Sequence, residues 1–66
     1  MTITLNGQPQ TLAAPATVLD LLAVLGFGGR PVVVELNQQA LLPREHATAG
    51  LNEGDVIEIV QITAGG

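Results

Sequence analysis

Residues 56–62 are the part of this sequence that most restricts how the chain can fold. Five of these seven residues are β-branched and apolar, namely Val56, Ile57, Ile59, Val60 and Ile62. A run of this kind suits a strand in the middle of a sheet, paired on both sides. It is followed by Thr63-Ala64-Gly65-Gly66, which has neither charge nor bulk. Because glycine ranges widely over backbone conformations, we expect a flexible tail, residues 63–66, to leave a rigid strand.

The composition fits a single small domain, residues 1–66. The chain is 47% hydrophobic, which excludes intrinsic disorder, and it has no cysteine for a disulfide or a thiolate metal site. A small domain without disulfides fits a reducing compartment. Neither a charged leader nor an apolar run of roughly 18 residues, as a membrane span needs, is present. We therefore expect a soluble, cytoplasmic protein.

The charge distribution narrows the choice of partners. The formal net charge is −4, and Arg30 and Arg44 are the only two Lys or Arg residues. Nucleic acids and anionic membranes are both bound through clusters of basic residues, so neither is an expected partner. An acidic surface of this kind suits a more basic protein.

The first part of the chain predicts a hairpin and a helix. Strands 3–5 and 10–12 flank Asn6-Gly7, a dipeptide that favours the tight turn of a hairpin. Thr17 is a suitable N-cap for the helix, and Gly26 is a suitable left-handed terminator. We expect Phe27 to pack on the core. Between the two caps, apolar residues fall at helical spacing on one face, at Val18, Leu21, Leu22 and Leu25.

The second part predicts three more strands. Residues 32–36 form the third strand, and a turn over residues 37–39 follows it. Residues 40–42 form a short fourth strand, which ends at Pro43. Residues 44–48 suit one helical turn, and Gly54 is the expected positive-φ residue of the turn before the last strand.

This order predicts an α+β fold of the β-grasp type, with a mixed sheet of four to five strands and one main helix on one face. The first and last strands should be adjacent and parallel. The expected core is Ile3, Leu5, Val18, Leu21, Leu22, Leu25, Ile57 and Ile59. By alternation, the last strand should expose a partner surface on the uncovered face, at Glu58, Val60 and Ile62.

Few residues suggest catalysis. His46 is the only histidine, and we expect it at the surface without a metal. The six carboxylates are scattered, and no lysine follows the glycines of residues 26–29 to hold a phosphate. The chain is thus not expected to be an enzyme or to bind a cofactor. The one group placed in an unusual way is the carboxyl group of Gly66, at the end of a thin glycine tail.

The sequence resembles the ThiS family, the sulfur carrier proteins of thiamine biosynthesis. The similarity runs along essentially the whole chain. The segments that carry it are Thr17-Val18-Leu19-Asp20-Leu21-Leu22, Val34-Glu35-Leu36-Asn37-Gln38-Gln39, Pro43-Arg44-Glu45, Gly54-Asp55-Val56-Ile57 and Ala64-Gly65-Gly66.

The resemblance implies a ubiquitin-like β-grasp and a reaction cycle. An E1-like adenylating enzyme would use ATP and Mg²⁺ to activate the Gly66 carboxylate. A persulfide from a cysteine desulfurase would then convert it to a thiocarboxylate, and thiazole synthase would take the sulfur. Ala64, Gly65 and Gly66 would enter the active sites of these partners.

Three alternatives share the fold and the Gly-Gly end. The first is a sulfur carrier for molybdopterin or tRNA thiolation, the second a ubiquitin-like protein modifier, and the third an interaction module whose glycines have no chemical role. The segment 37–45 and the short length favour the thiamine type.

Overall fold

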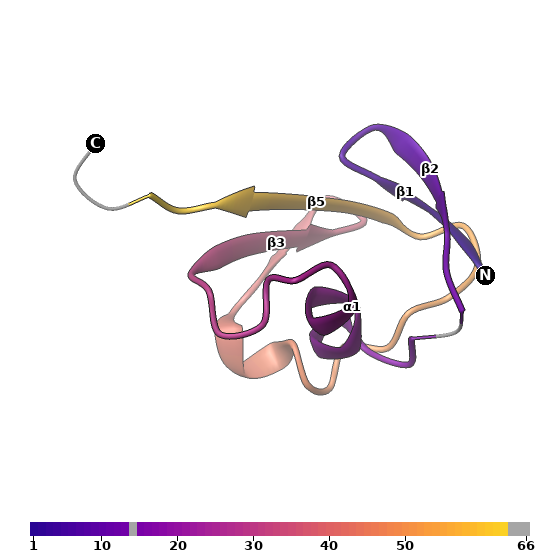
Figure 1. Ribbon diagram of the computed structural model, residues 1–66. Coiled ribbons are helices and arrows are strands. Elements are labelled where there is room, and N and C mark those ends of the chain that lie inside the picture. Colours follow the sequence, from indigo (N-terminus) through magenta and orange to yellow (C-terminus); the bar gives the residue numbers. More distant parts are fainter. Residues whose placement is uncertain (14, 64–66) are drawn as a thin grey trace.

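The computed structural model describes residues 1–13 and 15–63, which form one sheet with a single α-helix packed against it (Figure 1). Five strands make the sheet, in the order β2-β1-β5-β3-β4. The strands are β1 (Thr2–Leu5), β2 (Gln8–Thr11), β3 (Val32–Leu36), β4 (Gln39–Leu41) and β5 (Val56–Gln61). The helices are α1 (Val18–Val24) and the short 3₁₀ helix η1 (Pro43–Glu45).

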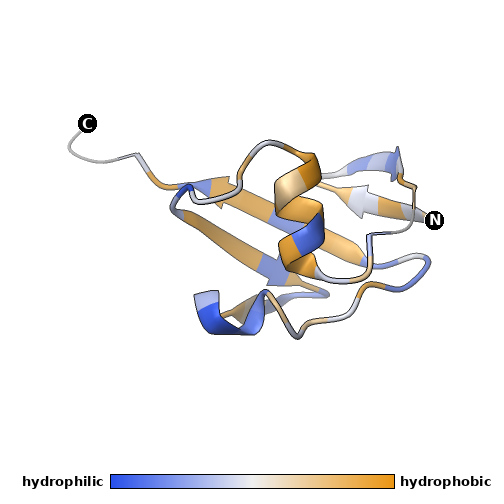
Figure 2. Ribbon diagram, turned by 60° about the horizontal axis from the view of Figure 1, so that its bottom comes forward, coloured by the Kyte–Doolittle hydropathy of each residue, from blue (hydrophilic) through white to orange (hydrophobic). Residues whose placement is uncertain are grey.

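The central strand is β5, as its apolar run predicts. It pairs parallel with β1 and antiparallel with β3, while β2 and β4 complete a hairpin on either side. Figure 2 shows α1 crossing one face of this sheet, above the mostly apolar β3 and β5. The mixed sheet and its single covering helix confirm the predicted β-grasp fold, with β1 and β5 adjacent and parallel.

Both hairpins turn through two residues with positive φ. These are Asn6 (50°) and Gly7 (81°) in the first hairpin, and Asn37 (51°) and Gln38 (69°) in the second. Two such residues make a type I′ turn, whose twist matches that of the flanking strands. The second turn is one residue shorter than predicted, so β4 begins at Gln39, opposite Leu36, and not at residue 40.

The first asparagine of each turn also extends the sheet through its side chain. The Asn6 amide accepts the Ile59 N–H at 2.8 Å and donates to the Ile59 carbonyl at 3.2 Å. On the other side of β5, Asn37 Oδ1 accepts the Val56 N–H at 2.9 Å. Each hairpin turn is therefore hydrogen-bonded to the central strand.

Both predicted helix caps are present. Thr17 Oγ1 accepts the Asp20 N–H at 3.2 Å, and Asp20 Oδ2 accepts the Thr17 N–H at 3.1 Å, which is a capping box. At the other end, Gly26 has φ 83°, and the Phe27 N–H donates to the Leu22 carbonyl at 2.8 Å. This is the Schellman pattern, and it limits α1 to seven residues.

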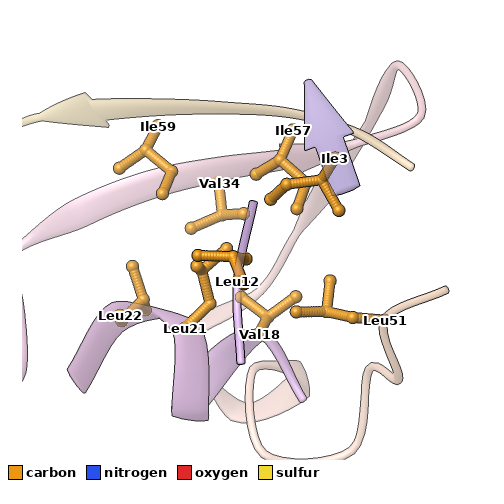
Figure 3. Packing of buried hydrophobic residues seen from close by; sticks show 9 residues of the cluster. All are labelled: Ile3, Leu12, Val18, Leu21, Leu22, Val34, Leu51, Ile57 and Ile59. Carbon is orange, nitrogen blue, oxygen red and sulfur yellow. The ribbon is translucent and has the colours of Figure 1, made fainter. Parts of the chain in front are cut away.

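The core lies between α1 and the covered face of the sheet. In Figure 3 the side chains of β1, β3 and β5 point toward those of the helix. Leu5 and Leu25, predicted in the core, are only partly buried at its margin, because each lies at the end of its element. Three residues outside that predicted set, Leu12, Val34 and Leu51, are buried as well. The buried set is Ile3, Leu12, Val18, Leu21, Leu22, Val34, Leu51, Ile57 and Ile59.

None of the helices within residues 1–13 and 15–63 is long enough and apolar enough to cross a membrane.

Candidate functional site

The C-terminal end of β5 leads toward the predicted tail, residues 63–66. Beyond Gln61, the Ile62 N–H donates to the Pro31 carbonyl at 2.9 Å, so pairing on the β3 side continues to residue 62. The predicted site of acylation, Gly66, and the rest of the predicted arm, Ala64 and Gly65, lie outside the described residues. The candidate site is therefore described through the surfaces around Gln61 and Ile62, where the chain leaves the sheet.

The side chains of β5 alternate as predicted. Ile57 and Ile59 are buried under the helix, at 0% and 7% exposure. Val60 is 61% exposed and Ile62 is 51% exposed. Val60 and Glu58 therefore lie on the face of the sheet opposite α1, and both apolar side chains lie near the end of the described chain.

Val33 belongs to the same exposed surface and was not predicted there. It is 42% exposed and is the cross-strand partner of Val60. The run Val32-Val33-Val34 is uniformly apolar, so the sequence carries no alternation from which its outward member could be identified. We call Val33, Val60 and Ile62 the open-face patch.

An acidic pair adjoins this patch. Glu58 of β5 lies directly opposite Glu35 of β3, and both side chains are exposed. Like charges in directly opposed positions destabilise a sheet. The open face thus combines apolar side chains with two carboxylates, a combination that suits a protein surface with apolar and basic groups.

The other four carboxylates have structural roles. Each accepts hydrogen bonds from backbone N–H groups, for example Glu45 from Leu42 at 2.7 Å and Glu53 from Thr2 at 3.0 and 3.1 Å. These residues are Asp20, Glu45, Glu53 and Asp55. Among the residues described, no three His, Asp or Glu side chains converge as metal ligands would.

His46 is buried, so its predicted position at the surface is wrong. Its side chain is 7% exposed, and Nε2 has no hydrogen-bond partner among the described residues. The cause is the segment that follows η1, which packs against the start of α1. There the Leu19 N–H donates to the His46 carbonyl at 2.8 Å, and the Val18 N–H donates to the Ala49 carbonyl at 2.9 Å. A contact between segments so far apart in sequence leaves no local pattern.

A pocket of about 170 Å³ lies beside His46, on the helix side of the molecule. Its walls are Leu19 and Leu22 of α1, residues 27–32, and Pro43 and His46 at η1. Among the described residues that line it, Arg30 is the one Lys or Arg. We call it the Arg30 pocket.

Known proteins are similar to this chain in sequence or in fold. The model of the ThiS family matches residues 3–66. The sulfur carrier protein ThiS of Thermus thermophilus is 37% identical over 62 residues, which cover 94% of this chain and 95% of that protein. The crystal structure of ThiS from Geobacter metallireducens matches over the whole of both chains, with a TM-score of 0.84 and 30% identity.

Longer relatives contain a similar segment. A thiazole synthase of Paramagnetospirillum magneticum is 36% identical over 66 residues, and one of Magnetococcus marinus is 38% identical over the same length. This chain spans only 20% of the length of either protein. The family match, the similarity to a carrier of nearly equal length and the shared fold agree, and the chain belongs to the ThiS family.

Proposed function

We propose that this protein carries sulfur for thiamine biosynthesis, as a thiocarboxylate formed at the carboxyl group of Gly66. The observation that carries the proposal is the match of nearly the whole chain to the ThiS family, including a sulfur carrier of nearly equal length. The fold supports it, because the central strand leads directly into residues 63–66. In this role the chemistry belongs to partner enzymes and the chain is their co-substrate.

The proposed cycle begins with activation of the carboxylate. A carboxylate oxygen of Gly66 attacks the α-phosphorus of ATP on an E1-like enzyme, and pyrophosphate leaves. A persulfide sulfur from a cysteine desulfurase then attacks the acyl carbon and AMP leaves, which gives an acyl disulfide. A thiol reduces this disulfide to the thiocarboxylate. Activation is required because a free carboxylate is a poor electrophile.

Thiazole synthase is the proposed acceptor of the sulfur. Two thiazole synthases contain a segment similar to this entire chain, so a carrier-like domain and the synthase share one polypeptide in those proteins. We assign the open-face patch and Glu58 as the surface that partner enzymes contact. Exposed apolar side chains beside a reactive chain end are typical of an interface.

The tail provides the test. A variant that lacks Gly66 places its carboxylate about 3.5 Å short of the reacting phosphorus. Since adenylation depends on close positioning, we expect pyrophosphate exchange with the E1-like enzyme to be abolished. Gly65→Ala adds a Cβ and restricts the backbone, so exchange should slow without complete loss. Circular dichroism should show a native fold for both variants.

Wild-type exchange by the variant that lacks Gly66 would falsify the sulfur-carrier proposal. The intact mass of protein isolated from its native cells gives an independent measurement. It should reveal a fraction in which one oxygen atom is replaced by sulfur, and this fraction should be absent from the variant without Gly66.

A further inference from the structure

The two edges of β5 are held in different ways toward its C-terminal end. On the β3 side, backbone pairing continues past the strand, since the Ile62 N–H donates to the Pro31 carbonyl at 2.9 Å. On the β1 side, strand pairing ends at Ile57, the partner of Leu5, and the Asn6 N–H donates to the Ile57 carbonyl at 2.9 Å. The rest of β5 therefore runs beyond the end of β1.

Alternation determines which backbone groups of β5 lack a strand opposite them. Beside an antiparallel neighbour, successive residues of a strand turn their N–H and C=O groups to opposite edges. The even-numbered residues of β5 face β3, because the Val56 carbonyl accepts the Asn37 N–H at 2.7 Å. The backbone groups of Ile59 and Gln61 therefore face the β1 side, where β1 has already ended.

The Asn6 side chain takes the place of a strand at Ile59. Its Oδ1 accepts the Ile59 N–H at 2.8 Å, and its Nδ2 donates to the Ile59 carbonyl at 3.2 Å. Both bonds are partly buried, whereas those of the Asn37 amide in the second turn are exposed. For Gln61, the next residue that faces this side, no described residue provides a backbone partner there. Ile59 is thus the last point at which β5 is held on the β1 side.

The turn alone does not account for asparagine at position 6. The first position of this turn requires a positive φ, which glycine and aspartate also adopt readily. Of these three residue types, only asparagine has both a donor and an acceptor in its side chain, since ionised aspartate only accepts. The choice of asparagine is therefore explained by the two bonds to Ile59.

We propose that Asn6 is a positioning residue for the activation of Gly66. Its amide keeps the end of β5 in the sheet on the β1 side and so fixes the direction in which the chain continues past Ile62. This inference rests on the proposed function, in which an E1-like enzyme adenylates Gly66. An enzyme that docks on the sheet meets the carboxylate in line with ATP only when that direction is defined, and small misplacements of reacting groups are costly in rate.

The two turn asparagines provide a matched test. Asn6→Gly and Asn37→Gly both introduce a residue that readily adopts the positive φ of the turn, and each removes a side chain that is bonded to β5. They differ in place, because Asn6 binds near the end of β5 and Asn37 binds its first residue, Val56. A general loss of stability should therefore appear in both variants, and a loss of positioning in Asn6→Gly alone.

The kinetics of pyrophosphate exchange with the E1-like enzyme separate the two effects. The open face is unchanged in Asn6→Gly, so KM for the carrier should stay within about twofold of the value for Asn37→Gly. We expect kcat to be about tenfold lower, since the carboxylate of the docked carrier is less often in line with the α-phosphorus. A merely structural role would lower the fraction of folded carrier, which raises KM and leaves kcat unchanged.

Amide hydrogen exchange, recorded by NMR, tests the two Asn6 bonds without the enzyme. Relative to the slowest amides of each variant, the Ile59 N–H should exchange about tenfold faster in Asn6→Gly than in Asn37→Gly.

A second substitution keeps the test decisive if Asn6→Gly does not fold. Asn6→Asp adopts the same φ and keeps the acceptor for the Ile59 N–H, but it loses the donor to the Ile59 carbonyl. Its kcat should be about threefold lower than that of Gln8→Glu, again with little change in KM. Gln8→Glu is the control because it adds the same charge at an exposed position of β2.

The outcomes separate the two proposals. If the wild type supports exchange and Asn6→Gly has the kcat of Asn37→Gly, positioning by Asn6 is wrong and the sulfur-carrier function stands. Equal protection of the Ile59 N–H in these two variants would also overturn the inference, because Asn6 would then not hold the strand. If the wild type, with Gly66 intact, supports no exchange, the proposed activation and the positioning role are both wrong.

Discussion

At the scale of single residues, the His46 side chain is buried although one of its polar atoms has no hydrogen-bond partner among the described residues. Nε2 is buried without a hydrogen-bond partner in the described part of the chain. Such an atom loses its contact with water on folding and regains nothing, at a cost of about 1–3 kcal/mol. The free carrier therefore bears a local penalty at a position that lines the Arg30 pocket.

Replacement of His46 by Leu should make the isolated protein more stable. Leucine has a similar volume and no polar atom, so we expect the free energy of unfolding to rise by about 1 kcal/mol. Urea denaturation followed by circular dichroism measures it. His46→Gln, which keeps a buried polar group, is the control and should show no such gain. A marked loss of stability in His46→Leu would show that the imidazole makes a favourable interaction instead.

Leu21, by contrast, is an apolar side chain packed against apolar neighbours. Its side chain is fully buried between the helix and the sheet. We expect Leu21→Ala to lower the free energy of unfolding by about 2–5 kcal/mol, through lost burial and the cavity that remains. Val24→Ala, at a position that is 68% exposed on the same helix, should change it by less than about 0.5 kcal/mol. Equal unfolding midpoints for the two variants would contradict the orientation of α1.

At the scale of elements, the two hairpin turns adopt the same left-handed backbone conformation with different residues. Both turns place asparagine first, and both asparagines hydrogen-bond to β5. The first turn has Gly7 as its second residue, whereas the second turn has Gln38. A side chain in the left-handed region costs about 1–2 kcal/mol, and glycine avoids that cost.

Gln38→Gly should accordingly stabilise the domain. The relief of backbone strain exceeds the added entropy of the unfolded chain, and we expect a net gain of about 0.5–1 kcal/mol. Thermal unfolding measures it. Gln39→Gly, one residue further along in β4, removes a side chain from a strand and should destabilise the domain. A lower melting temperature for Gln38→Gly than for the wild type would be evidence against strain at this turn.

The elements were the most predictable part of the structure, because their signals are local. The caps of α1 and the turn of the first hairpin follow from Thr17, Gly26 and Asn6-Gly7, and all are present. The second strand of that hairpin was predicted over residues 10–12 and is β2, Gln8–Thr11, because Pro9 is accommodated in an edge strand. Strand β4 begins one residue earlier than predicted, since Gln39 suits a turn and a strand about equally. Features made by distant segments, such as the burial of His46 and the Arg30 pocket, have no local signal.

At the scale of the whole molecule, one helix covers one face of a five-stranded sheet. The alternation along β5 was enough to predict that Val60 and Ile62 are exposed, and this is confirmed. The family was also predictable from the sequence. The role of Gly66 remains a prediction, because residues 64–66 lie beyond the described part of the chain.

Val60→Asp tests the open face as a docking surface. Val60 is 61% exposed, so the substitution should leave the fold intact. A carboxylate within the open-face patch should weaken binding to the E1-like enzyme about tenfold or more, as measured by calorimetry. Val24→Asp places the same change on the exposed side of α1 and should leave binding unchanged. Equal affinities for these two variants would remove the open face from the interface.

The strand order has a consequence for how the protein is made. The hairpins β1-β2 and β3-β4 are joined in the sheet only through β5, which is the last strand in the sequence. During synthesis on the ribosome, the two halves cannot become one sheet until β5 has begun to emerge, because Ile57 is the first residue that pairs with both β1 and β3, and contacts of such long range form late. A partner that recognises the assembled sheet would therefore bind the chain only after β5 has paired with both hairpins.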